Sequence, residues 1–195
     1  MFSRVLLALF ASLTLSVAGG QTKVVVLPRG PVTRIVSPDR KWILIFECRD
    51  YSQPRKLWIE QSRMHRRRAV RDFERSLSIS WAPNSRSFFV SDDLGSNKSE
   101  SYLYDPVTLR VTDLAAVIVA ADAGAGEYLK AGHSYLQAKR WINSHELLVT
   151  LFGHFDEPPQ RVSRVRHPRG FTLRYHVDLN GAVHKLAESS EENPE

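Results

Sequence analysis

Short apolar runs separated by turn residues fill the chain from residue 23 onward. Many of these runs alternate apolar and polar positions, and others are continuously apolar, as in half-buried and fully buried β-strands. The pattern predicts strands at Lys23–Leu27, Trp42–Cys48, Lys56–Glu60, Leu77–Trp81, Phe88–Ser91, Tyr102–Tyr104, Leu109–Val111, Leu147–Leu151, Phe171–Asp178 and Ala182–Leu186. Asn180-Gly181, between the last two, is the strongest hairpin signal. We therefore expect a mainly β, antiparallel fold.

One segment departs from the strand pattern. Leu114–Ala131 is rich in alanine, and Asp113 precedes it as a candidate N-cap, which favours a helix or helical turns. Gly124 and Gly126 weaken that helix. We interpret the segment as one helical insertion between units of strands.

The chain also repeats itself. Ser37-Pro38-Asp39-Arg40-Lys41 precedes one apolar strand, and Ala82-Pro83-Asn84-Ser85-Arg86 precedes another, with Pro38 and Pro83 45 residues apart. A period near this length is typical of one four-stranded propeller blade. A third, more diverged copy begins at Trp141. We therefore expect three antiparallel propeller-type blades in an open or incomplete propeller, because closed propellers have about four to eight blades.

These turns resemble those of the WD40-like (PD40-type) β-propeller repeat proteins of the bacterial envelope, whose repeat begins W-S-P-D-G-K. Leu57-Trp58-Ile59 and Leu103-Tyr104-Asp105-Pro106-Val107-Thr108 are similar to the downstream part of that repeat. The propeller of the periplasmic Tol-system protein and the propellers of prolyl-oligopeptidase-type peptidases carry such repeats. The resemblance implies a binding or scaffold protein. The family glycine is Arg40 in one copy and Ser85 in the other, so we expect the preceding Asp39 and Asn84 to carry the positive-φ turn.

Three blades raise the question of closure. The sheets can stay open, use Lys23–Leu27 to complete the last blade, or be closed by a partner. Unpaired strand edges invite pairing. We therefore expect Lys23–Leu27 to pair with a strand of an existing sheet, in the same chain or in a neighbour.

The N-terminus indicates export. Arg4, the uncharged apolar run Val5–Val17 and the small residues Ala18–Gly20 have the layout of a secretory signal peptide at residues 1–20, with an uncleaved anchor as the alternative. Residues 21–187 then form a single β-propeller-like domain, and residues 188–195 form an acidic tail that we expect to be disordered. We expect a periplasmic or secreted protein without a stable membrane span in its mature form.

Composition adds two points. The 195-residue chain has a net charge of +6 and a single cysteine, Cys48, so it cannot form an internal disulfide, and we expect Cys48 to be a small buried hydrophobe. The basic stretch Arg63–Arg71 is expected in a loop or at an edge. It is either a solvated surface or an anionic-surface-binding module that uses Arg66, Arg67, Arg68 and Arg71. Export argues against nucleic acid as its partner.

Catalytic motifs are absent from the sequence: it has no G-x-S-x-G, no P-loop and no H-E-x-x-H. We therefore expect a non-enzymatic binding or scaffold protein without a cofactor, whose partner is an envelope protein or a second copy of itself. The alternative is a small metal-dependent hydrolase that uses His154, Asp156 and Glu157. A calcium site is a further alternative for the polar loop that carries Asp92, Asp93, Asn97 and Glu100.

Overall fold

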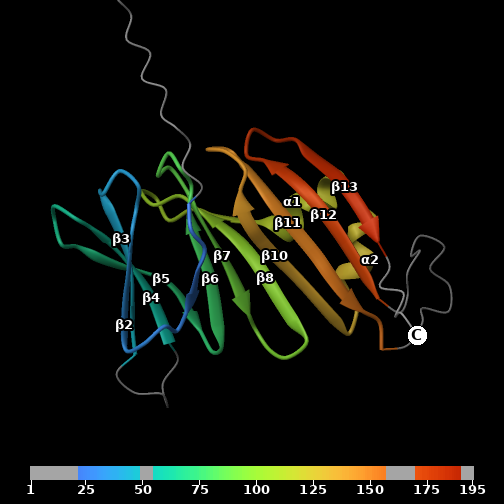
Figure 1. Ribbon diagram of the computed structural model, residues 1–195, viewed down its shortest axis with the longest axis horizontal. Coiled ribbons are helices and arrows are strands. Elements are labelled where there is room, and N and C mark those ends of the chain that lie inside the picture. The colour runs from blue at the N-terminus through green and yellow to red at the C-terminus, as the bar shows by residue number, and fades with distance from the viewer. Residues whose placement is uncertain (1–21, 49–54, 157–169, 190–195) are drawn as a thin grey trace, which may run out of the picture.

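The computed structural model describes residues 22–48, 55–156 and 170–189 and is mostly β (Figure 1). The first repeat forms a separate four-stranded antiparallel sheet in the order β2-β3-β4-β5. Its strands are β2 (Val32–Val36), β3 (Trp42–Glu47), β4 (Arg55–Gln61) and β5 (Arg67–Phe73). The predicted mainly β, antiparallel fold is confirmed.

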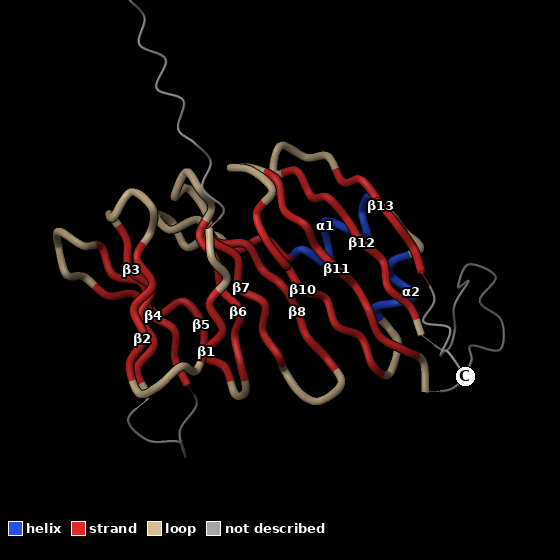
Figure 2. Tube along the Cα trace, in the orientation of Figure 1, coloured by secondary structure: helices blue, strands red, loops and turns tan. Residues whose placement is uncertain are grey.

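The second and third repeats share one nine-stranded sheet in the order β1-β6-β7-β8-β10-β11-β12-β13, with β9 paired to β8. Its strands are β1 (Val25–Leu27), β6 (Ser76–Trp81), β7 (Phe88–Asp93), β8 (Lys98–Tyr104), β9 (Val111–Asp113), β10 (His133–Trp141), β11 (Glu146–His154), β12 (Phe171–Asp178) and β13 (Val183–Ser189). Figure 2 shows how these strands run side by side from β6 to β13.

The joining of these two repeats differs from the expected separate blades. Strand β9 has only three residues and pairs with the Tyr102–Tyr104 end of β8. The other end of β8 is therefore open to another strand, and β10 pairs there in parallel, with Ser134 opposite Lys98 and Tyr135 opposite Ser99. An unpaired edge attracts a strand, and here it fuses two repeat units into one sheet.

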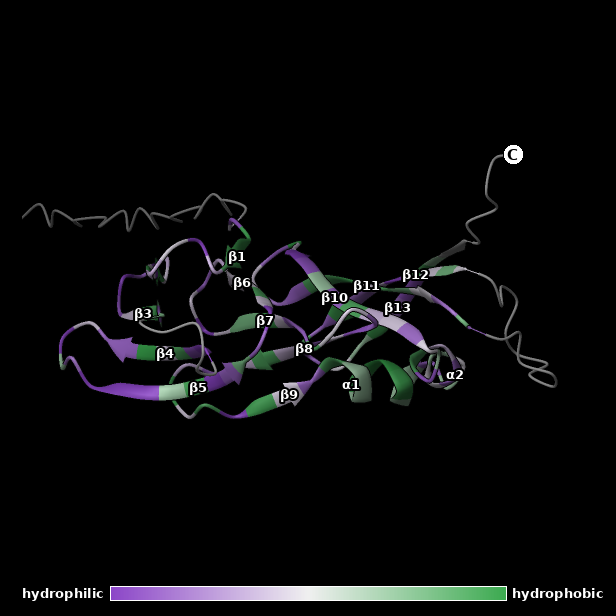
Figure 3. Cartoon of the chain, turned by 90° about the horizontal axis from the view of Figure 1, so that it is seen from below, coloured by the Kyte–Doolittle hydropathy of each residue, from purple (hydrophilic) through white to green (hydrophobic). Residues whose placement is uncertain are grey.

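Two helices follow β9, as the alanine-rich segment predicts. Asp113 caps α1 (Leu114–Ala121) by accepting a 2.8 Å hydrogen bond from the Ala115 amide, and α2 (Ala125–Leu129) follows. The helices lie against one face of the third repeat (Figure 3). Buried residues of the helices, of β10–β12 and of the second repeat form one core, and a second core lies between the first and second repeats. Neither helix in the described part of the chain is long or apolar enough to span a membrane.

The repeated turns have the left-handed residue at a different position from the expected one. Arg40 and Ser85 themselves have φ of 60° and 62°, so the expectation that Asp39 and Asn84 carry the positive φ is wrong. Those two side chains instead fix the turns by accepting hydrogen bonds from the amides two residues on, Lys41 at 3.1 Å and Arg86 at 3.0 Å. This is the Asx-turn geometry that both side chains favour.

Adjacent turns are also bonded to one another. The Asp39 amide donates to Ser85 Oγ at 2.9 Å, and Asn84 Nδ2 donates to the Ser144 carbonyl oxygen at 3.1 Å. The three repeats therefore stand in register along their turns, as neighbouring units of a propeller do.

The N-terminal strand pairs within the chain, as expected. β1 lies antiparallel to β6, with Val26 opposite Ser78. It therefore joins the second repeat and does not complete the last one. Cys48 is buried, as predicted. The expected signal peptide lies outside the described residues, and β13 continues to Ser189, two residues into the segment that we expected to be a disordered tail.

Candidate functional site

The outer face of the third repeat is the side of β10–β12 that lies opposite the helices. Leu136, Ala138 and Val149 join the helix-side core, so the alternate side chains point the other way. We call this surface the third-repeat outer face, and its residues on β10 and β11 are Tyr135, Gln137, Lys139, Arg140, Leu148, Thr150 and Phe152.

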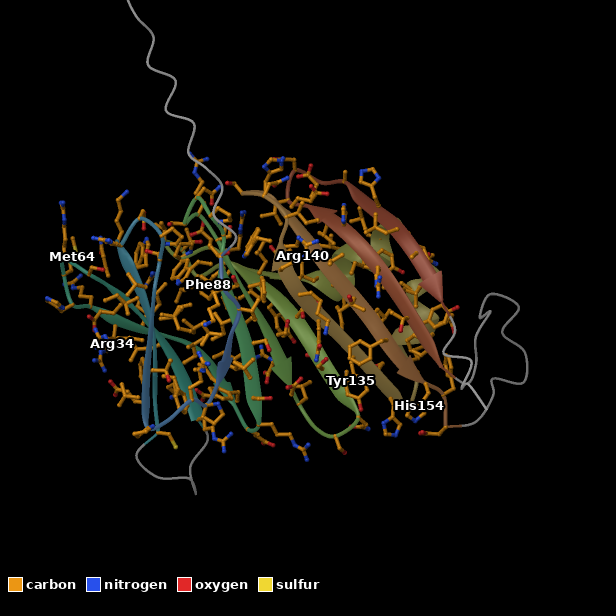
Figure 4. All side chains as sticks on the ribbon, viewed as in Figure 1. Arg34, Met64, Phe88, Tyr135, Arg140 and His154 are labelled. Carbon is orange, nitrogen blue, oxygen red and sulfur yellow. The ribbon has the colours of Figure 1, made fainter. Side chains whose placement is uncertain are left out.

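Aromatic and cationic side chains pack on the third-repeat outer face. The rings of Tyr135 and Phe152 stack with centroids 5.1 Å apart. Lys139 Nζ lies 5.1 Å from the centroid of Phe152. Figure 4 labels Tyr135 on this sheet. Figures 1 and 3 show no other sheet of the described residues over this face, so the aromatic side chains on it are only half-buried.

The outer face of the first repeat carries Trp58, with a lysine ammonium 5.3 Å from its ring centroid, beside a group of ion pairs. Arg67 donates to Glu60 at 2.9 Å and to Glu47 at 2.8 Å, and Arg34 forms an ion pair with Glu60 at 3.4 Å. The hydrogen bond from Arg67 lowers the pKa of Glu60, because it favours the charged carboxylate. These ion pairs share the first-repeat outer face with the Trp58 ring.

The predicted basic site is divided between the surface and an internal interface. Arg67, Arg68 and Arg71 lie on β5, an edge strand, which agrees with the expected edge position. Arg66 is exposed, whereas Arg68 donates to the backbone carbonyls of the turn at Pro106-Val107. The four guanidinium groups therefore do not form one continuous patch.

Arg71 joins the two sheets. It donates to Asp92 Oδ2 on β7, and its guanidinium lies 4.2 Å from the centroid of Tyr102 on β8. Asp92 is buried, and its Oδ1 is the one buried side-chain polar atom without a hydrogen-bond partner among the described residues. Burial raises the pKa of Asp92 in spite of the nearby Arg71. This ion pair is a structural link between the repeats.

The calcium alternative finds little support in the polar loop. Asp93 accepts a hydrogen bond from Ser76, and Glu100 binds Lys98 at 2.9 Å and accepts from Tyr102. With Asp92 bound to Arg71, each carboxylate already has a partner within the protein.

Three candidate metal ligands meet at the end of the β10–β11 hairpin. His133 lies opposite His154 in the antiparallel register, and their rings stack with centroids 4.2 Å apart and an interplanar angle of 15°. Asp156 Oδ1 lies 3.4 Å from His133 Nε2 and 3.9 Å from His154 Nε2. Figure 4 labels His154 at the same end of the sheet as Tyr135. No other such trio of His, Cys, Asp and Glu occurs in the described part of the chain.

This cluster differs from the predicted one. His154 and Asp156 come together as the sequence suggested, Glu157 lies outside the described residues, and His133 was missed. A signal for His133 was present: it lies ten residues before Asn143, and His154 lies ten residues after Ser144. A hairpin folded about that turn brings the two histidines together.

No family model and no curated protein matches the chain. Solved structures do. The β-propeller domain of the Trilobed protease from Pyrococcus furiosus, described as having an open velcro topology, matches at a TM-score of 0.50 and 15% identity, over 80% of this chain and 43% of its own. TolB from Acinetobacter baumannii matches at a TM-score of 0.41 and 14% identity, over 83% of this chain and 33% of its own. The acylaminoacyl peptidase of Pyrococcus horikoshii matches at a TM-score of 0.46 and 12% identity, over 81% of this chain and 24% of its own.

The chain spans less than half the length of each of these proteins. At this level of identity the likeness concerns the fold alone. Together with the four-stranded first repeat and the bonded turns, the match to the Trilobed protease domain shows a fold of the β-propeller type.

Proposed function

We propose that the protein is an exported, non-enzymatic binding or scaffold protein of the cell envelope. It holds another envelope protein, or a second copy of itself, on the third-repeat outer face. The observation that carries this proposal is the aromatic pair Tyr135–Phe152 on a face that no other sheet covers among the described residues (Figures 1 and 3). Export rests on Arg4 and on the apolar run Val5–Val17.

The two ends of the array support this choice of surface. A propeller closes with about four to eight blades, and the described residues form a shorter array with an outer face at each end. The first-repeat outer face carries the ion pairs of Glu60 with Arg34 and Arg67. The third-repeat outer face presents aromatic rings beside Lys139, and aromatic side chains are enriched at protein interfaces. The first-repeat outer face also carries Trp58, so the choice of the third repeat rests on its stacked Tyr135–Phe152 pair.

The basic stretch supports an anionic-surface function less well. Arg68 and Arg71 are committed to the contact between the two sheets. To bind these two guanidinium groups, an anion at the surface would have to displace the carbonyl and carboxylate oxygens that already accept their hydrogen bonds. Only Arg66 among the predicted binding arginines is exposed without such a role in the described contacts.

Site-specific photo-cross-linking tests the proposed function. A photoreactive amino acid replaces Phe152 on the third-repeat outer face, and in a matched control it replaces Val107, which is 63% exposed in the turn between β8 and β9. In intact cells we expect one discrete cross-linked product at position 152 and none at position 107. The mass of that product distinguishes another protein from a second copy. Equal cross-linking at both positions, or none at position 152, would contradict the proposal.

A further inference from the structure

We propose that His133, His154 and Asp156 form a binding site for a divalent metal ion of the zinc class. One ligand atom from each side chain lies within 4.8 Å of the other two. Ligand atoms of a tetrahedral zinc site stand about 3.3 Å apart, since each is about 2.0–2.2 Å from the metal. The 3.4 Å distance from His133 Nε2 to Asp156 Oδ1 is close to this value. The His154 ring, now stacked on that of His133, has to turn toward the ion, which also shortens its 3.9 Å distance to Asp156.

The hydrogen bonds behind His133 orient its ring for metal binding. The Tyr135 hydroxyl donates its proton to the Ser96 carbonyl, so it accepts from His133 Nδ1, which lies 3.4 Å away. A neutral imidazole with its proton on Nδ1 has its lone pair on Nε2, the nitrogen that faces Asp156. Metal-binding histidines use such a second partner to fix their tautomer. A lone pair that faces a carboxylate is repulsive, and a cation between them turns both groups into ligands.

Two glycines allow the ligands to approach each other. A Cβ at Gly132 would lie 1.9 Å from Asp156 Oδ2, so the carboxylate occupies space that any other residue would fill. A Cβ at Gly153, which has φ of +152°, would lie 1.9 Å from the backbone oxygen of His133. The backbone at the end of the hairpin therefore leaves room for the close contact of all three ligands.

The ligand set selects the class of metal. Imidazole nitrogens suit Zn²⁺, Cu²⁺, Ni²⁺ and Co²⁺, whereas Ca²⁺ and Mg²⁺ prefer oxygen ligands alone. The side chains of His133, His154 and Asp156 are 32%, 49% and 63% exposed, so an ion can enter from solution. Three protein ligands leave a fourth position for water or for a donor from another molecule. Metal binding here does not depend on the proposed partner-binding function.

Isothermal titration with ZnCl₂ tests the site on the full chain, purified without a polyhistidine tag. We expect one zinc per chain, and at least tenfold weaker binding in His133→Ala, His154→Ala and Asp156→Asn. Gly132→Ala keeps all three ligands but displaces the Asp156 carboxylate, so it should weaken binding to a similar extent. His145→Ala, at the exposed turn of the same hairpin, should bind zinc as the parent does, and MgCl₂ should give no comparable binding. Circular dichroism confirms that each variant is folded.

Long-range ¹H–¹⁵N spectra of the parent give a second readout. Zinc should shift the Nε2 resonances of His133 and His154, while Nδ1 of His133 keeps its proton. The proposal is overturned if the parent shows no saturable zinc binding. It is also overturned if His145→Ala loses as much affinity as His133→Ala, or if the ring resonances of both cluster histidines stay unchanged.

Discussion

The indole Nε1 of Trp81 donates to the carbonyl oxygen of Ile35 at 3.1 Å, across the boundary between the first and second repeats. Trp141 makes the equivalent bond to the carbonyl oxygen of Ser80 at 3.2 Å, across the next boundary. Ile35 lies two residues before Ser37 of the first turn, and Ser80 lies two residues before Ala82 of the second. The same contact between repeats is therefore made twice, and it combines a buried aromatic ring with a hydrogen bond to the preceding unit.

Truncation of this contact should be costly. Trp81 is only 2% exposed, so Trp81→Ala should lower the free energy of unfolding by about 3–5 kcal/mol. Trp81→Phe keeps most of the ring but removes its hydrogen bond to the Ile35 carbonyl, so it should cost about 1 kcal/mol. Urea unfolding measures both. Val107→Ala, at an exposed site, should stay within about 0.5 kcal/mol of the parent, and an unchanged Trp81→Ala would show that the repeats do not stack through this residue.

The contribution of the ion pair between Arg71 and Asp92 to stability can be measured by comparing a single and a double variant. Arg71→Met leaves the Asp92 carboxylate buried without its cation, and loss of one partner of a buried pair costs about 3 kcal/mol. The double variant Arg71→Met/Asp92→Leu removes the stranded charge and should be more stable than Arg71→Met alone. Thermal or urea unfolding of the three proteins gives the comparison. If the double variant is the less stable, the pair does not act as a buried link between the sheets.

The two left-handed turn residues should respond differently to glycine. Arg40 is exposed and has φ of 60°, so Arg40→Gly should stabilise the protein by about 1 kcal/mol through relief of steric strain. Ser85 has the same backbone conformation, but its hydroxyl accepts from the Asp39 amide. Ser85→Gly should therefore gain less than Arg40→Gly, or lose stability. Equal gains in melting temperature would mean that the bond between the turns contributes nothing.

The Glu60 carboxylate should contribute to acid sensitivity. Because the hydrogen bond from Arg67 lowers its pKa in the folded state, this group adds stability above its unfolded pKa of about 4.3, and that stability is lost as the pH falls through the lower folded value. Unfolding of the parent and of Glu60→Gln should differ most near neutral pH, and the difference should shrink in acid. A difference that is the same at both pH values would contradict this assignment.

The sequence predicts the local features of this fold well. The turns at Pro38 and Pro83, the Asp113 cap and the Asn180-Gly181 hairpin depend on neighbouring residues, and all are present. The parallel pairing of β8 with β10 could not be predicted in the same way. This pairing depends on the length of β9, which has only three residues, and the sequence does not predict strand ends to within a few residues.

Long-range polar contacts limited prediction of the candidate sites. Arg71 belongs to a run of basic residues that suggests a solvated surface, yet it reaches Asp92 on another sheet. His133 meets His154 only through the register of a hairpin that also contains a bulge between Ala138 and Arg140. A single shift of that register would have placed His133 on the opposite face, so the cluster requires the three-dimensional structure.

Cysteine accessibility in cells tests the central claim most directly, which is that an exported, incomplete propeller is covered by a partner on its third-repeat outer face. In a Cys48→Ala background, Lys139→Cys places a thiol on that face, and Val107→Cys places one on an exposed turn away from it. A maleimide that cannot cross the inner membrane is applied to cells with a permeabilised outer membrane, and to the purified proteins. We predict that both thiols react in the purified proteins, that Val107→Cys also reacts in cells, and that Lys139→Cys is protected there. Labelling of both positions in cells at equal rates, or of neither until the cells are lysed, would contradict the account.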